Sequence, residues 1–422
     1  MGHTQVFRPM KGVIILSVKI KAIAAAALII SAVLLCGCAV PGGAAAPPES
    51  SDPAAESTGS EVIVIFPSKS PEESPENASA EPSGGDAGGA DAESGVEEGA
   101  QEPNPESESE PEPELEPPST IVTITISAAG DCTLGGDPRY ANRLVREFES
   151  NANDHSIFLS NVRHIFEADD LTIINLEGPL TERTSHLDKG YVFRGPPHFA
   201  KILSSSGVEA VTLANNHSKD FLDAGYADTV EALEAEGVGY FGFEYNTIME
   251  IKGIKVGLFG YNMWYDGADN RKRIESSIAD LREQGAQLII AYFHWGTELS
   301  TSPDAYQRPI GRFAIDSGAD LVLGSHPHVL QGIEVYKGRN IVYSLANFCF
   351  GGNNNPADKD TMIFQQTFTF DEGVLLDANE INIIPARVSS VNTHNDFRPT
   401  VAEGEEAKRI IEKVRTLSER LK

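Results

Sequence analysis

Short apolar segments that alternate with amphipathic stretches dominate the sequence after residue 120. The apolar segments have the length and β-branched content of buried strands, and they cover residues 121–127, 171–176, 208–213, 255–261, 288–293, 321–323 and 341–345. Helical spacing of apolar residues is found between them, at residues 140–149, 158–168, 197–206, 225–236, 270–284 and 304–317. Strands that alternate with helices predict an α/β domain whose sheets are covered by helices.

Polar side chains follow the predicted strands at equivalent positions. They are Asp131, Glu177, Asn216, His217, His294, His326 and His328. In open α/β sheets the strand ends form the crevice where ligands bind, so we expect these residues to share one site. A solvated loop would explain any one of them, but it explains seven at equivalent positions poorly. His155, His164, His186 and His198 have no comparable context and are interpreted as surface or packing residues.

The chemistry of these seven residues favours a divalent-metal site. Carboxylates, an Asn carbonyl and imidazoles suit Zn²⁺, Mn²⁺, iron or Mg²⁺. One ion, or two about 3.5–4 Å apart, could bind phosphate oxygens and activate a water molecule. A further His outside the ligand set could protonate the leaving group. In His326-Pro327-His328 the two imidazoles can face one site, because side chains two apart in an extended segment point the same way.

The N-terminus resembles an export signal. Lys19 and Lys21 precede an apolar core at residues 22–35, which is too short to span a bilayer comfortably. The following Gly37-Cys38 resembles the bacterial lipobox, so residues 1–38 are predicted to be a lipoprotein signal and Cys38 the lipidated residue. We therefore expect a lipoprotein on the extracytoplasmic face of the cell membrane. An ordinary signal peptide or an uncleaved anchor helix is the alternative.

Residues 39–119 differ in composition from the rest of the chain. They hold 20 acidic residues and one Lys, together with many Pro, Ser and Gly, which predicts a disordered acidic linker that spaces the domain from the membrane. An apolar island at residues 61–66 is either a short recognition strand or a sticky patch. Of the total charge of −29, residues 1–38 contribute +4 and the linker −19, which leaves −14 for residues 120–422. This charge disfavours nucleic acid as a partner.

Other candidates remain open on the residues alone. Arg194, with Lys189, Arg308 and Arg312, could form a basic cluster that binds an anionic substrate, although a solvated surface also explains them. Cys132 and Cys349 are compatible with a disulfide in an exported protein and equally with two buried thiols. Residues 361–370 and 380–385 are predicted to be closing strands of a domain spanning 120–402. Residues 403–422 are predicted to be a helix whose packing face holds Ala407, Ile410, Ile411, Val414 and Leu417.

Six ordered motifs give the chain a family resemblance. They are Gly130-Asp131-x-x-Leu134-Gly135, Asn175-Leu176-Glu177-x-Pro179-Leu180-Thr181, Leu213-Ala214-Asn215-Asn216-His217-x-x-Asp220, His294-Trp295-Gly296-x-Glu298, Gly318-Ala319-Asp320-Leu321-Val322-x-Gly324-x-His326-Pro327-His328-Val329 and Tyr343-Ser344-Leu345-x-Asn347-Phe348. Together they resemble the CapA family of capsule or poly-γ-glutamate synthesis proteins, which is similar to calcineurin-like metallophosphoesterases. The resemblance implies a four-layer α/β/β/α sandwich with the site at the strand ends.

The resemblance also implies roles for the site residues. Asp131 corresponds to the first metal ligand, Glu177 to a bridging carboxylate, Asn216 to the Asn ligand and His217 to the general acid. His294 and His326 correspond to ligands of one metal and His328 to a ligand of the other. The wider phosphoesterase pattern has His where this chain has Thr133 and Asp where it has Glu177, and the more frequent Gly-His-His is here Gly324-Ser325-His326. These departures put a fully occupied two-metal centre in question.

Three functions follow from these expectations. The first is an envelope protein that acts in the synthesis, export or anchoring of capsule or poly-γ-glutamate, with polymer synthetase and export membrane proteins as partners. The second is a secreted metal-dependent phosphoesterase that acts on an envelope phosphate ester. The third is a non-catalytic module that binds an anionic polymer.

Overall fold

The computed structural model describes residues 62–65 and 120–422. The predicted signal, the predicted lipidation site Cys38 and most of the predicted linker lie outside the described residues.

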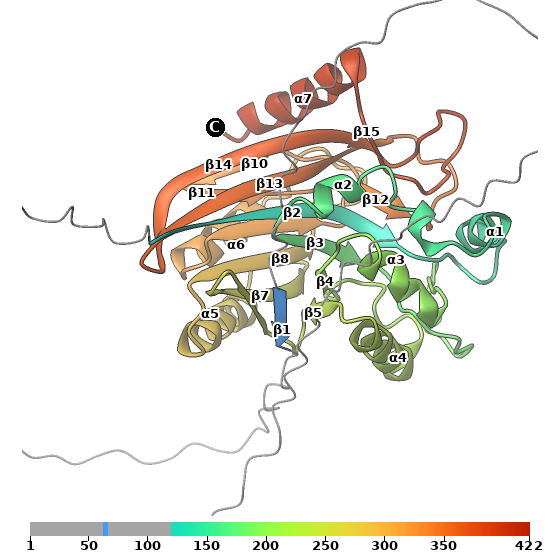
Figure 1. The fold of residues 1–422 in the computed structure, drawn as a ribbon, viewed down its shortest axis with the longest axis horizontal. Coiled ribbons are helices and arrows are strands. Elements are labelled where there is room, and N and C mark those ends of the chain that lie inside the picture. The colour runs from blue at the N-terminus through green and yellow to red at the C-terminus, as the bar shows by residue number, and fades with distance from the viewer. Residues whose placement is uncertain (1–61, 66–119) are drawn as a thin grey trace, which may run out of the picture.

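Two β-sheets form the centre of the domain (Figure 1). The seven-stranded sheet has the order β1 (Val62–Ile65), β6 (Thr247–Ile251), β7 (Ile254–Met263), β8 (Leu288–Trp295), β9 (Leu321–Ser325), β11 (Arg339–Val342) and β10 (Ile333–Tyr336). The eight-stranded sheet has the order β15 (Thr400–Val401), β14 (Val374–Arg387), β13 (Asp360–Asp371), β2 (Ile121–Thr133), β3 (Leu171–Leu176), β4 (Ala210–Thr212) and β5 (Gly239–Phe241), and β12 (Asn347–Phe350) pairs with β2.

The central strands of each sheet run parallel. They are β7, β8, β9 and β11 in one sheet and β2, β3, β4 and β5 in the other. Their carboxyl ends therefore lie along one edge of each sheet, which is where ligand sites form in such sheets.

Helices cover the outer face of each sheet. Over the eight-stranded sheet lie α1 (Arg143–Ser150), α2 (Arg163–Phe166), α3 (Ala200–Ser204) and α4 (Leu222–Ala235), with the short 3₁₀ turns His155–Ile157 and Pro197–Phe199. Over the seven-stranded sheet lie α5 (Ala268–Glu283) and α6 (Gln307–Asp316). The last helix, α7 (Gly404–Glu419), packs against β10 and β14.

Three buried apolar clusters correspond to the three interfaces between these four layers. Leu171 and Ile173 of β3 face the core between the sheets, whereas Ile174 and Leu176 of the same strand face the helices. This alternation follows from the two-residue period of a strand. A third cluster joins β8 to α5 and α6. The domain is the four-layer α/β/β/α sandwich that the family resemblance implied, and it confirms the α/β class predicted from the alternating strands and helices.

Gly130 and Gly324 allow the backbone to come close at the edge where the site lies. A Cβ atom on Gly130 would lie 1.8 Å from the carbonyl oxygen of Ala346, and one on Gly324 would lie 2.3 Å from that of Tyr343. Only glycine fits at such distances. Gly130 directly precedes Asp131 on β2, and Gly324 lies two residues before His326, which follows β9, so the close approach occurs next to the site.

Several predicted elements differ from the structure. The predicted helix at residues 158–168 is reduced to α2, because the chain buries Phe158, Leu159 and Val162 through successive turns instead. The predicted strand at residues 380–385 is part of the longer β14, which begins at Val374. The apolar island at residues 61–66 was predicted to be either a short strand or a sticky patch. It contains the short strand β1, which pairs antiparallel with β6.

Two further findings concern the cysteines and the membrane. Cys132 and Cys349 lie on the paired strands β2 and β12 as buried free thiols, so no disulfide joins them. Burial raises the pKa of Cys132 to about 12. Among the helices of residues 120–422, none combines the length and apolarity needed to cross a membrane.

Candidate metal centre at the strand ends

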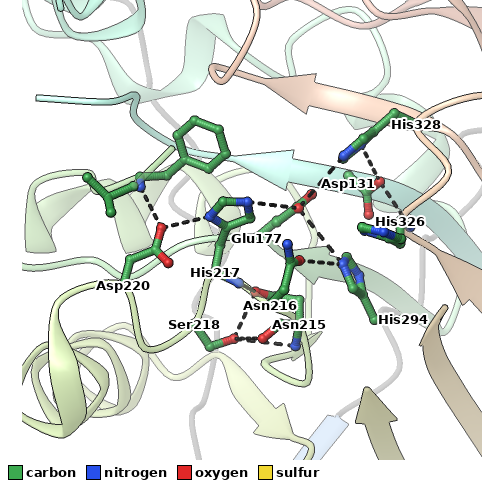
Figure 2. A network of polar contacts seen from close by, with 12 residues as sticks. Asp131, Glu177, Asn215, Asn216, His217, Ser218, Asp220, His294, His326 and His328 are labelled. Carbon is green, nitrogen blue, oxygen red and sulfur yellow. Dashed lines mark hydrogen bonds and ion pairs between the residues drawn. The ribbon is translucent and has the colours of Figure 1, made fainter. Parts of the chain in front are cut away.

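The seven predicted site residues converge from both sheets. Asp131 belongs to β2, Glu177 follows β3, and Asn216 and His217 follow β4 of the eight-stranded sheet. His294 belongs to β8, and His326 and His328 follow β9 of the seven-stranded sheet. Figure 2 shows their side chains around a common centre. The structure therefore brings together the seven side chains that the strand-end pattern singled out, and the roles given to them stay predictions.

Glu177 lies at the centre of this group. Its Oε1 atom is 4.0 Å from Nε2 of His217, 3.9 Å from Nε2 of His294 and 4.0 Å from Nε2 of His328. The side chain is fully buried, and neither carboxylate oxygen has a hydrogen-bond partner among the described residues. Burial, followed by the charge of Asp131, raises the pKa of Glu177 well above its ordinary value. A buried carboxylate without a hydrogen-bond partner is costly in its charged form, and a positively charged ligand would offset that cost.

Glu177, His326 and His328 have the geometry of a metal-ligand triad. One potential ligand atom from each lies within 4.8 Å of the others. Nδ1 of His326 is buried and has no hydrogen-bond partner within the described part of the chain. Burial, with the charge of His328, lowers the pKa of His326 to about 4, so its imidazole is neutral at pH 7, as a metal ligand must be. These orphaned donor atoms fit a divalent cation.

The backbone that carries the two histidines is strained. His326 has φ 98° and His328 has φ 59°, both in the left-handed region that non-glycine residues rarely adopt. The surrounding structure holds this conformation, since the backbone N–H of His326 donates to Oδ2 of Asp131 at 3.3 Å. Strain of this kind is concentrated at functional sites.

Asp131 joins the two sheets through hydrogen bonds. Its Oδ2 lies 3.0 Å from Nδ1 of His328, and its Oδ1 accepts from Nδ2 of Asn175 at 2.8 Å. Burial alone would raise the pKa of Asp131, but the bonds and charge of His328 and the bond from Asn175 outweigh it and lower that pKa. Burial likewise opposes the charged form of His328, but Glu177 and Asp131 outweigh it and raise the pKa of His328 to about 9.

His294 and Asn216 are held by a defined hydrogen-bond pattern. Nε2 of His294 lies 2.7 Å from Oδ1 of Asn216, and its Nδ1 lies 3.3 Å from the amide nitrogen of Asn175. Because the Asn oxygen can only accept and the Asn amide donates, the proton of His294 is on Nε2. Burial, with the charge of His326, lowers the pKa of His294 well below its usual value, so the ring is neutral.

His217 is oriented by Asp220. Nδ1 of His217 lies 2.7 Å from Oδ2 of Asp220, and its Nε2 points toward Glu177 (Figure 2). Lys189 donates to Oδ1 of Asp220 at 2.6 Å and to the backbone carbonyl of Asn216 at 2.9 Å. Burial outweighs the neighbouring Asp220 and lowers the pKa of His217. This arrangement fixes which ring nitrogen of His217 faces the centre.

Aromatic rings flank the polar centre. The indole of Trp264 lies edge-on to the rings of His326 and His294, with centroid distances of 4.9 Å and 6.1 Å. Phe193 lies 4.3 Å from the ring of His217, and Phe350 lies 5.0 Å from that of His328. Polar groups among aromatic side chains are typical of ligand sites.

The predicted basic cluster does not form. Arg308 and Arg312 of α6 both pair with Glu334 of β10, whereas Lys189 is bound to Asp220. Arg194 donates to the carbonyl of Arg183 and its guanidinium lies over the ring of Phe221. Arg308 and Arg312 thus share one acidic partner, Lys189 has another and Arg194 has a backbone partner, and a substrate role for Arg194 stays a prediction.

Some residues of the site were missed or were given no role from the sequence. Asn175 and Asp220 both belong to the six sequence motifs, two residues before Glu177 and three residues after His217. Membership in these motifs was the signal that could have pointed to them as site residues. Trp264 is the first residue after β7, so it follows the same strand-end rule as the seven polar residues. A pattern of polar strand-end residues does not single it out, because its side chain is aromatic.

Comparison with known families matches residues 125–352, more than half of the chain, to the family described as bacterial capsule synthesis protein PGA_cap. All seven site residues lie within this match. The family match therefore covers the whole centre described above.

Individual relatives are more distant. The chain is 26% identical over 286 residues to the capsule biosynthesis protein CapA of Bacillus anthracis, which covers 62% of this chain and 67% of the relative. It is 27% identical over 248 residues to the PGA biosynthesis protein CapA of Bacillus subtilis strain 168, covering 54% and 63%. A probable polyglutamine synthesis accessory protein of Mycobacterium tuberculosis is 25% identical over 210 residues, covering 43% and 55%. The matches span about two thirds or less of these relatives.

Among solved structures, the chain is similar to a hypothetical protein from Thermus thermophilus. The similarity covers 62% of this chain and 99% of that chain, at 17% sequence identity and a TM-score of 0.40.

Proposed function

Because the chain belongs to the bacterial capsule synthesis protein family, we propose that it acts in the synthesis, export or anchoring of a capsule polymer such as poly-γ-glutamate. Its domain contributes a divalent-metal, phosphoesterase-like centre to this process. The observation that carries the proposal is the buried carboxylate of Glu177, which lies within 4.0 Å of three imidazole nitrogens and has no hydrogen-bond partner among the described residues.

The residues of the centre have complementary roles in this proposal. Glu177, His326 and His328 would hold the cation. Asp131, Asn216 and His294 are the further ligands that the family resemblance implies, and His294 would have to lose its Nε2 proton to serve as one. When bound, a divalent ion supplies Lewis-acid activation of a phosphate ester. The charged form of His217 would donate its Nε2 proton to the leaving oxygen and keep its Nδ1 proton, which is hydrogen-bonded to Asp220 and keeps the ring in place. Because the pKa of His217 is lowered, this charged form becomes more abundant as the pH falls.

Metal content and hydrolysis test the centre. The purified chain is expected to retain roughly one to two divalent ions after loading with Mn²⁺ or Zn²⁺ and dialysis. Glu177→Ala and His326→Ala should lose the ion, whereas His198→Ala, on the helical face away from the centre, should keep it. Hydrolysis of 4-nitrophenyl phosphate or its diester by the Mn²⁺-loaded chain should fall about 100-fold in His217→Ala, with metal content unchanged.

The outcomes separate the candidate functions. Absence of bound metal, with Glu177→Ala and His326→Ala behaving like the wild type, would contradict the metal centre. Retention of metal without hydrolysis of either ester would instead favour a non-catalytic module that binds an anionic polymer.

We further propose that a lipid on Cys38 anchors the chain to the extracytoplasmic face of the membrane. The lipobox-like Gly37-Cys38 after a short apolar core supports this placement. A diacylated chain should partition with membranes, since each buried methylene contributes about 0.8 kcal/mol. Cys38→Ala should move the protein from the membrane fraction to the soluble fraction after export, and Cys36→Ala is the matched control that should not. Equal membrane association of both variants would refute the anchor.

A further inference from the structure

Trp264 is exposed beside a polar centre, where a large aromatic side chain needs an explanation. The chain has two tryptophans. Trp295 is fully buried among the residues that join β8 to α6, as expected for a core residue, whereas Trp264 is 43% exposed. A single exposed aromatic side chain is common in itself, but this one lies against the histidines of the centre, so its position bears on what the centre can bind.

The position of Trp264 points to a ligand of the centre. Its indole is T-shaped to the ring of His326, with centroids 4.9 Å apart and planes at 76°, and it lies perpendicular to the ring of His294 at 6.1 Å. The two histidine rings therefore contact the indole but leave part of its surface exposed. A group bound at Glu177, His326 and His328 would lie next to the exposed part of the indole.

Aromatic side chains also stand on the other side of the centre. Phe193 contacts the ring of His217 at 4.3 Å, and Tyr191 stacks on Phe193 at 6.5 Å. Tyr191 is 65% exposed, so this second wall continues outward from the centre. A bound group held at the histidines would thus have an aromatic surface on two sides.

We propose that Trp264 is a specificity-determining residue that packs against a ring in the alcohol part of a phosphate ester substrate. The inference rests on the proposed phosphoesterase-like function and specifies its substrate class. The phosphate lies at the histidine and carboxylate centre, and the apolar face of an aryl or glycosyl ring lies on the indole. Ring stacking on an aromatic side chain contributes affinity that a ringless ester cannot obtain.

The two tryptophans make this contact directly measurable. Because Trp295 is buried, quenching of the intrinsic fluorescence by acrylamide reports mainly on Trp264. In the Zn²⁺-loaded chain, saturating phenyl phosphate or glucose 1-phosphate should lower the quenching slope about twofold. Methyl phosphate and inorganic phosphate, which carry no ring, should leave the slope unchanged. Comparison of the phenyl and glucosyl esters shows which kind of ring is preferred.

Binding constants of variants provide the second measurement. Trp264→Ala should weaken binding of the preferred ring ester about 10-fold and that of methyl phosphate less than about twofold. Trp264→Phe should keep part of the preference because it keeps an aromatic face. Tyr336→Ala, on β10 and hydrogen-bonded to Asp316, is the aromatic control and should change neither constant.

The results distinguish failure of the inference from failure of the function. If phosphate and methyl phosphate bind but neither ring ester binds more tightly or protects Trp264, the inference is overturned and the phosphate site stands. If no phosphate compound binds the metal-loaded chain, the proposed function is overturned and the inference with it. Should Trp264→Ala not fold, the quenching measurement on the unaltered chain still decides.

Discussion

Carboxyl groups of the same chemical type have different environments in this domain. Asp131 is surrounded by donors that lower its pKa, whereas burial without donors raises that of Glu177. Glu209 is a third buried carboxyl group with its own environment. It lies beside Thr172 at the amino end of β3, whereas the candidate metal centre lies at the carboxyl ends of the strands. Burial, with the charge of nearby Asp169, raises the pKa of Glu209 to about 8.

Glu209 should make stability depend on pH. A carboxyl group with a raised pKa in the folded state contributes stability below its unfolded pKa, near 4.5, and this contribution is lost as the pH rises through about 8. Glu209→Gln keeps an acceptor for the Thr172 N–H but cannot ionise. Urea unfolding should show the variant more stable than the wild type by up to about 5 kcal/mol at pH 8.5 and equal to it near pH 4.5.

The exposed substitution Glu231→Gln on α4 is the control for this measurement and should follow the wild type at both pH values. A constant difference between Glu209→Gln and the wild type across this range would contradict the assigned pKa.

Residue-scale prediction succeeded where a side chain's position along its strand determined its surroundings. The seven polar residues were found because each lies at or near the end of a strand. The role of Asp220 was not found, because it depends on the 2.7 Å contact with His217 and the 2.6 Å contact with Lys189, which lies 31 residues away in the sequence. Such contacts between distant segments have no periodic signature.

At the scale of elements, α7 shows the limit of a helical pattern. The predicted packing face included both Ile410 and Ile411, and the structure buries Ile410 completely in the core between the sheets but leaves Ile411 37% exposed. Adjacent residues are about 100° apart around a helix, so the orientation of α7 on β10 and β14 decides which of them is covered.

Substitution of these two neighbours tests the packing of α7. Ile410→Ala should lower the free energy of unfolding by about 3 kcal/mol, because it leaves a cavity in the core. Ile411→Ala is the matched control, with the same change in helix propensity, and should cost less than about 1 kcal/mol. Chemical denaturation measures both, and equal losses would show that α7 does not pack as described.

The edge of the seven-stranded sheet is another feature of element scale. β1 pairs with β6 in the register Val62 to Ile251 and Ile65 to Ile248, and so covers a strand edge that would otherwise expose unpaired backbone groups. The short apolar run was visible in the sequence. Its partner was not, because a four-residue strand carries no information about which distant edge it joins.

At the scale of the whole molecule, the candidate metal centre lies between the two sheets and draws residues from both. Glu177 comes from the eight-stranded sheet, and His326 and His328 come from the seven-stranded sheet. A cation bound by all three would link the two halves of the sandwich and bind only the folded state. Metal binding should therefore be measurable as stability.

Bound metal is expected to raise the melting temperature, and this effect should require ligands from both sheets. At a free metal concentration about 100 times the Kd, the folded state gains about 2.7 kcal/mol, or about 4 °C for a domain of this size. Differential scanning fluorimetry should show this rise in the wild type and its reversal by a chelator. Glu177→Ala and His326→Ala should each abolish it, and His198→Ala should retain it. A rise that survives either ligand substitution would place the ion elsewhere.

The order of strands and helices, the α/β class and the strand-end residues followed from the sequence, since periodicity and strand ends are local properties of a chain. The pairing of the two sheets, the place of Glu177 among three imidazoles, the thiol state of Cys132 and Cys349 and the exposure of Trp264 followed only from the folded arrangement. These properties depend on which distant segments meet, and that is set by packing of the whole sandwich rather than by any one segment.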